Sequence, residues 1–84
     1  MTVEEFNTKY SEFLEKGNYG LAIQNSKVIQ FLDKEFEKFI NRENFKFSQI
    51  KLKFGYARVY AEGLHLQELQ FLEEKINELN GTTR

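Results

Sequence analysis

The sequence predicts an all-α protein, a compact single domain of four helices formed by residues 1–84. Apolar residues recur three and four positions apart in four successive segments, as they do along one face of an α-helix. Residue types that begin or end helices stand at the borders of these segments. The helices are expected at about residues 3–16, 26–41, 48–62 and 66–80. Their short connections favour antiparallel neighbours.

The first two helices have recognisable borders. Thr2 and Glu5 form a capping-box pattern at the start of the first, and Gly17 stands where that helix would end. Asn25 or Ser26 can cap the second helix. The apolar stripes comprise Val3, Phe6, Tyr10, Phe13 and Leu14 in the first helix, and Ile29, Leu32, Phe36, Phe39 and Ile40 in the second.

The segment that follows fits two kinds of structure. One set of apolar residues is spaced as a helical stripe: Phe47, Ile50, Phe54, Ala57, Ala61 and Leu64. Another set alternates as in a strand: Ile50, Leu52, Phe54 and Tyr56. The helical pattern is longer than an ordinary strand of about 5–6 residues, and a strand here has only residues 19–23 as a partner. We therefore predict a helix, and keep as the alternative an α+β fold with a short strand within residues 45–56.

The fourth helix has a regular stripe, formed by Leu69, Leu72, Ile76 and Leu79, and Gly81 is expected to end it. Neither end of the chain has the apolar run of a signal peptide, and no segment approaches the roughly 20 apolar residues of a membrane span. We therefore expect a cytoplasmic protein that does not bind membranes.

Composition argues against catalysis. The chain has no cysteine, which excludes disulfides and thiolate chemistry, and His65 is the only histidine. The pairs Glu4-Glu5 and Glu73-Glu74 would point about 100° apart on a helix, so neither forms an acid–base couple. There is no glycine-rich phosphate loop, calcium loop or metal-ligand spacing. We expect a non-enzymatic protein with no catalytic residues, metal or cofactor.

Charge is unevenly distributed along the chain although the net charge is only −1. Acidic segments flank a basic, aromatic stretch at residues 42–60. Cations interleaved with rings are typical of proteins that hold single-stranded nucleic acid. Binding of nucleic acid or of a nucleotide-like anion is therefore one hypothesis, although nucleic-acid binders are usually basic overall. Its candidate anion-binding residues are Arg42, Lys46, Lys51, Lys53, Arg58 and Tyr60.

The preferred hypothesis is a small protein-interaction module: an adaptor, an inhibitor or a self-associating subunit of the kind that phages and mobile elements encode. A helix at residues 48–62 would have a second apolar face opposite its main stripe, and that face would be buried or would meet a protein partner or a second copy. Aromatic rings that lie off the helical stripes add to this surface. The candidate partner-binding residues are Leu52, Tyr56, Val59, Phe31 and Phe71.

Overall fold

The computed structural model describes residues 1–14, 20–21 and 24–81 of the chain, and these residues form an α+β fold. The elements in chain order are α1 (Val3–Lys9), the 3-10 turn η1 (Ser11–Phe13), β1 (Gly20–Leu21), α2 (Ser26–Phe39), β2 (Lys46–Lys53), β3 (Tyr56–Glu62) and α3 (Leu66–Leu79). β2 and β3 form an antiparallel hairpin, and the two residues of β1 pair in parallel with β2.

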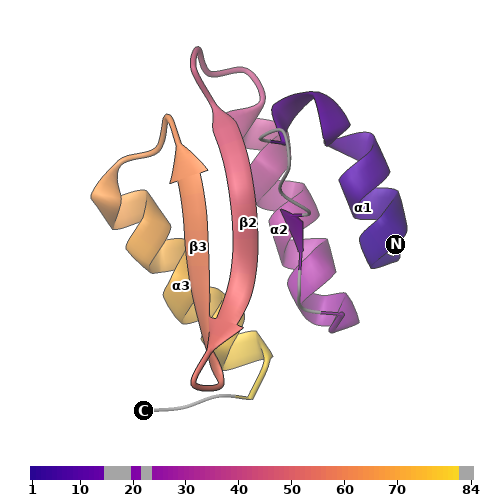
Figure 1. Cartoon of the computed structure of the whole chain (residues 1–84), viewed down its shortest axis with the longest axis vertical. Coiled ribbons are helices and arrows are strands. Elements are labelled where there is room, and N and C mark those ends of the chain that lie inside the picture. The colour runs from indigo at the N-terminus through magenta and orange to yellow at the C-terminus, as the bar shows by residue number, and fades with distance from the viewer. Residues whose placement is uncertain (15–19, 22–23, 82–84) are drawn as a thin grey trace.

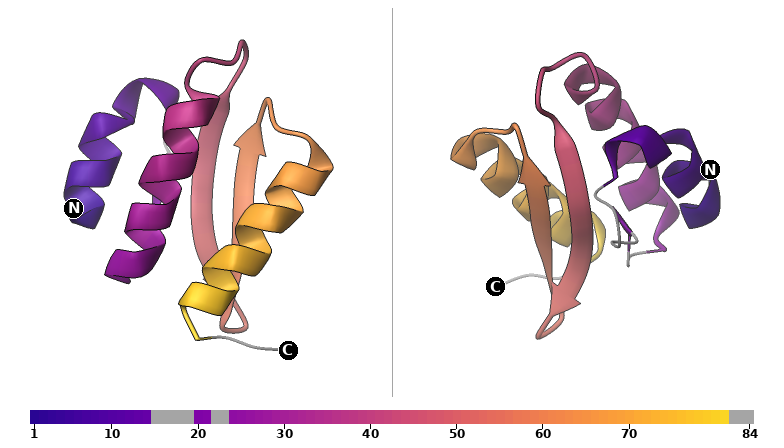
Figure 2. Two further views of the ribbon diagram at one scale, coloured as in Figure 1. Left: turned by 180° about the vertical axis from the view of Figure 1, so that it is seen from behind. Right: turned by 45° about the horizontal axis from the view of Figure 1, so that its top comes forward.

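The helices lie on one side of the hairpin. In Figure 1, β2 and β3 stand in front of α2 and α3, and α1 lies on the far side of α2 from the hairpin. Figure 2 shows the same arrangement from behind, with α2 and α3 now in front of the strands. No described helix covers the front of the hairpin. An antiparallel sheet can leave one face to solvent in this way.

The core lies between the hairpin and the helices and is built around aromatic rings. Phe36 of α2 is its centre, since five rings surround it at centroid distances of 4.8 to 6.2 Å: Phe6, Tyr10, Phe39, Phe45 and Phe47. Aliphatic side chains from both long helices and both long strands complete the buried cluster: Val28, Ile29, Leu32, Ile50, Ala57, Val59, Leu72 and Ile76.

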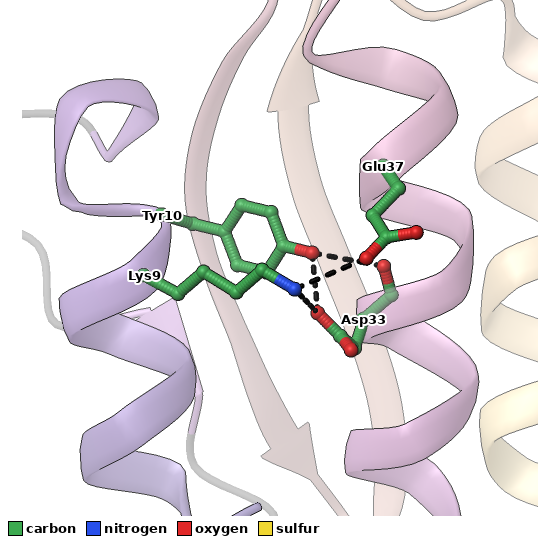
Figure 3. A network of polar contacts seen from close by, with 4 residues as sticks. All are labelled: Lys9, Tyr10, Asp33 and Glu37. Carbon is green, nitrogen blue, oxygen red and sulfur yellow. Dashed lines mark hydrogen bonds and ion pairs between the residues drawn. The ribbon is translucent and has the colours of Figure 1, made fainter.

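A polar network fixes the end of α1 against α2 (Figure 3). The Lys9 ammonium donates to Asp33 at 2.8 Å and to Glu37 at 3.1 Å, and the Tyr10 hydroxyl donates to both the carbonyl and a carboxylate oxygen of Asp33. Burial and the Asp33 hydrogen bond raise the pKa of Tyr10 to about 12. Burial would raise the pKa of Asp33, but the hydrogen bonds from Lys9 and Tyr10 outweigh it and lower that pKa.

The prediction of an all-α, four-helix domain was wrong, because the expected helix at residues 48–62 is replaced by the end of β2, a tight turn and β3. Its three-four spacing has another origin. A β-bulge between Phe47 and Gln49 inserts one residue into β2, so Phe47 and Ile50 face the same way although they are three positions apart. Ala57, the next residue of the apparent stripe after Phe54, is a buried residue of β3, the second strand of the hairpin. The alternative with a strand within residues 45–56 overlaps β2 but omitted β3, which is the main pairing partner.

The other three expected helices are present, and α2 and α3 lie close to their expected bounds. The Thr2–Glu5 capping box is present, and Asn25 caps α2 by accepting from the backbone N–H of Lys27 at 2.9 Å. α1 ends at Lys9, earlier than expected, and continues as η1. The expected stop at Gly17 lies outside the described residues. No helix in the described part of the chain is both long and apolar enough to cross a membrane.

Candidate functional site

The uncovered face of the hairpin gathers most of the predicted cations. Along each strand, side chains alternate between the core and the opposite face of the sheet. We call that opposite face the outer face; it consists of Lys46, Gln49, Lys51 and Lys53 of β2, with Tyr56, Arg58, Tyr60 and Glu62 of β3. In the strand register, Lys51 stands opposite Arg58, and Lys46 stands opposite Glu62. The outer face thus places four cations and two tyrosines together with one carboxylate.

The tyrosines lie among these cations. The Lys51 ammonium lies 5.2 Å from the centroid of the Tyr60 ring, within the range of a cation–π contact. Tyr60 is 42% exposed, so its ring is accessible to a ligand. Tyr56 is half-buried at the opposite end of β3. Residues four apart on a strand are separated by about 13 Å, so the two tyrosines can contact different parts of an extended ligand.

The turn between the strands carries an exposed ring. Phe54 and Gly55, the two residues of the turn, have φ of 55° and 78°, and a type I′ hairpin turn requires positive φ at both positions. Gly55 adopts this backbone at little cost, whereas a phenylalanine there is a conformational outlier. The Phe54 side chain is 97% exposed. The predicted helix had Phe54 on its main apolar stripe, which would have buried the ring, and this prediction was wrong.

A hollow opens at this end of the outer face. It is lined by Lys53, Phe54, Tyr56 and Arg58 and has a volume of about 380 Å³. Two rings and two cations therefore surround one small space. The Arg58 guanidinium is held at its margin, since Nη1 lies 3.8 Å from a carboxylate oxygen of Glu73 on α3.

α3 supports the site by covering the free edge of β3. The backbone N–H of Ala57 donates to Asn77 Oδ1 at 2.8 Å, and the N–H of Val59 donates to Glu73 Oε2 at 3.0 Å. Asn77 is itself buried and donates to the Glu73 carbonyl at 2.8 Å. At Ala57 and Val59 these side chains take the place of a neighbouring strand, so this part of the edge is not open to pairing with another chain. The hairpin thus presents its face rather than its edge.

Arg42 does not belong to the outer face. It lies in the connection between α2 and β2, and its guanidinium makes a bidentate ion pair with Glu68 of α3 at 2.7 and 2.5 Å. The hydrogen bonds from Arg42 and from the His65 backbone lower the pKa of Glu68 to about 2. His65 is the N-cap of α3, so both hydrogen bonds to Glu68 lie at the start of this helix and have a structural role there. The structure brings together the other predicted anion-binding residues: Lys46, Lys51, Lys53, Arg58 and Tyr60.

The predicted partner-binding residues do not form one surface. Val59 is 5% exposed and belongs to the core, Leu52 faces the helix side of the sheet, and Tyr56 faces outward. Their shared face depended on the helix that the structure does not contain. Phe31 and Phe71 do meet, across α2 and α3, with ring centroids 6.0 Å apart.

Sequence reasoning missed Phe54 and Gln49 as members of the exposed site. The available signal was Gly55 between two runs of alternating residues, which is the position of a glycine in a two-residue hairpin turn. The Phe-Gly pair is less diagnostic than Asn-Gly or Asp-Gly, because phenylalanine disfavours the left-handed backbone. Comparison with protein-family models, curated proteins and solved structures gave no match.

Proposed function

We propose that the protein binds a nucleic-acid strand across the outer face of the β2–β3 hairpin, in a binding rather than a catalytic role and in the cytoplasm. The observation that carries this proposal is the gathering of cations and tyrosines on a sheet face that no described helix covers. Cations can neutralise phosphates while aromatic rings contact bases and sugars, which is how many single strands are held.

The net charge of −1 does not oppose this proposal, because charge is segregated in space. Lys51 and Arg58 stand opposite each other in the strand register and Lys53 is the next outward residue of β2, whereas the one carboxylate of the outer face, Glu62, stands opposite Lys46 at the other end of the strands. Glu73 partly offsets Arg58 at 3.8 Å. A local cationic surface is sufficient for attraction, since charges separated by more than about 10 Å are largely screened at 0.1 M salt.

The test is the salt dependence of binding to a fluorescently labelled single-stranded oligonucleotide, measured by anisotropy. Each phosphate neutralised on a single strand contributes a slope of about −0.7 to log K against log salt. Three contacts, from Lys51, Lys53 and Arg58, predict a slope of about −2. Changing Lys51 and Lys53 to alanine should reduce the slope to about −0.7 and weaken binding.

A matched control removes the same charge elsewhere. Lys27 and Lys34 are exposed on α2, away from the outer face, so the double variant Lys27→Ala/Lys34→Ala has the same net charge as the hairpin variant. The control should retain the wild-type slope. Equal weakening by both variants would show that overall charge, rather than the outer face, determines binding.

A second candidate function is association with a protein through the helix side. Phe71 is 52% exposed although it contacts Phe31, so this pair offers aromatic surface to a partner or a second copy. Light scattering over a range of concentrations tests self-association. A mass that rises with concentration in the wild type, but not in Phe71→Gln, would support it; a constant monomer mass would exclude it.

A further inference from the structure

Phe54 has a conformation and an exposure that the hairpin does not need. A left-handed backbone costs an L-residue other than glycine free energy, and asparagine would form the same turn more readily. The ring is also 97% exposed, so it contributes almost nothing to the core. Residues held in strained backbone conformations cluster at active sites, ligand clamps and switch regions. The Phe54 side chain therefore points to a contact outside the fold.

The surroundings of Phe54 indicate the chemistry of that contact. The adjacent hollow of about 380 Å³ is lined by this ring, by Tyr56 and by the cations Lys53 and Arg58. Its volume is at the lower end of the range of about 300–1,000 Å³ for small-ligand sites. An aromatic ring beside two cations matches a flat, apolar group attached to an anion. A nucleotide has this composition.

We infer that the turn forms a base-stacking subsite: Phe54 stacks on an unpaired base, and Lys53 and Arg58 hold the adjacent phosphate. This inference rests on the proposed function and specifies its substrate class as single-stranded nucleic acid. A base inside a duplex has both of its faces covered by neighbouring bases, so it presents no face to Phe54. Stacking is tolerant of base identity, so the subsite selects unpaired strands rather than a sequence.

An acidic protein is the main competing ligand, and the surroundings of Phe54 disfavour it. Rings that anchor protein interfaces usually lie within a largely apolar patch from which charged residues are depleted. Here the hollow that Phe54 lines is completed by Lys53, Arg58 and Tyr56, and the nearest exposed aliphatic residue of β2, Leu52, faces the helix side of the sheet. An acidic polypeptide is nevertheless included as a probe in the test.

The experiment compares three labelled probes with equal numbers of phosphates: a single strand, a strand of abasic nucleotides, and a duplex. Polyglutamate is the fourth probe. The wild type should bind the single strand at least about 5- to 150-fold more tightly than the abasic strand, because the abasic strand has no base to stack on Phe54. Phe54→Asn removes the ring in a turn that asparagine favours, so the variant should fold and its preference for the single strand over the abasic strand should fall about 5- to 150-fold, leaving only what the tyrosines contribute.

Two further variants make the test specific to the turn. Phe54→Trp retains an aromatic face and should retain the preference for bases. Phe71→Ala removes an exposed ring from α3 and should change neither the preference nor the salt slope. In Phe54→Asn the salt slope should also stay at the wild-type value, since no cation is removed.

The outcomes separate the two proposals. Equal wild-type affinity for the single-stranded and abasic probes, unchanged in Phe54→Asn, would overturn the stacking subsite and leave nucleic-acid binding intact. Tighter binding of the duplex would also overturn it. Absence of salt-dependent binding to every nucleic-acid probe would overturn the proposed function itself, and polyglutamate binding that depends on Phe54 would then identify an acidic protein as the ligand class.

Discussion

At the scale of single residues, Phe54 combines two unfavourable properties in one position. Its backbone has φ of 55° and its side chain is almost fully exposed. Gly55 beside it has space for a Cβ, since an added Cβ would meet nothing within 4 Å, so glycine is required there for its backbone conformation alone. The turn therefore tolerates phenylalanine but does not favour it.

Replacing Phe54 with asparagine should stabilise the protein. Asparagine accepts the left-handed backbone, so we expect the free energy of unfolding to rise by about 1 kcal/mol, which corresponds to about 4–8 °C in Tm for a domain of this size. Thermal unfolding followed by circular dichroism measures the change. Phe54→Val, which is β-branched and worse suited to positive φ, should lower Tm. A lower Tm for the asparagine variant would show that the Phe54 ring stabilises the hairpin.

Glu68 should make stability depend on acid pH. Its folded pKa of about 2 is below the ordinary 4.5, so its ion pair with Arg42 stabilises the fold above pH 4.5 and is lost as pH falls toward 2. The pair is partly exposed, so screening by solvent should keep its contribution small. Denaturant unfolding at pH 7 and at acid pH should show a smaller loss for Glu68→Gln than for the wild type. Equal losses would contradict this role.

Residue-level signals predicted where α1 and α2 begin better than they predicted the site. Thr2, Glu5 and Asn25 act through their own backbone neighbours, so their roles can be predicted from local sequence. The exposure of Phe54 depends on whether the chain turns at Gly55. Local spacing alone allowed the ring to be placed in a helical core.

At the scale of elements, α3 does more than cover the core, because its side chains pair with the edge of β3. Asn77 and Glu73 are four residues apart, hence on one face of the helix, and their acceptors meet the N–H groups of Ala57 and Val59. Alternate residues of a strand point their N–H groups to the same edge. The spacing of Ala57 and Val59 along β3 therefore matches the spacing of Asn77 and Glu73 along α3.

Removing the Asn77 acceptor should destabilise the sheet edge. Asn77→Leu leaves the Ala57 N–H buried without a partner, so the free energy of unfolding should fall by about 1–3 kcal/mol. Chemical denaturation gives the loss, and hydrogen exchange of the Ala57 amide should become faster. Gln70→Leu, an exposed change on the same helix, should have an effect near zero. Equal stability of the two variants would contradict the edge-pairing role.

The Phe31–Phe71 contact should couple α2 to α3. Their rings meet edge-on at 6.0 Å, and such pairs contribute about 0.5–1.5 kcal/mol beyond burial. A double-mutant cycle with Phe31→Ala and Phe71→Ala, measured by denaturant unfolding, should give a coupling at the lower end of this range because Phe71 is half exposed. Strict additivity of the two losses would show that the rings do not stabilise each other.

Element type could be predicted where the local pattern had one interpretation. The stripes of α2 and α3 are uninterrupted, and both helices lie where the sequence placed them. β2 could not be assigned by spacing, because the bulge at Ser48 shifts its alternation by one residue, and β3 was missed because the turn at Phe54 and Gly55 was not recognised. The hairpin also depends on pairing between two strands, and periodicity within one strand does not show a partner.

At the scale of the whole molecule, the fold separates its apolar and cationic residues onto the two faces of one hairpin. Phe47, Ile50 and Val59 join the aromatic core, while Lys51, Lys53 and Arg58 face away from it. This separation follows from the alternation of side chains along a strand. The basic, aromatic composition of the stretch was visible in the sequence, but a helix would have distributed the same cations over two flanks.

The most direct test maps the ligand onto the molecule by NMR. A single-stranded oligonucleotide is titrated into 15N-labelled protein, and amide chemical shifts are followed at low salt. We predict that the perturbed amides cluster along the hairpin, at residues 51–60, and that amides around Phe31 and Phe71 stay in place. Perturbations confined to α2 and α3, or none at all, would contradict nucleic-acid binding by the outer face.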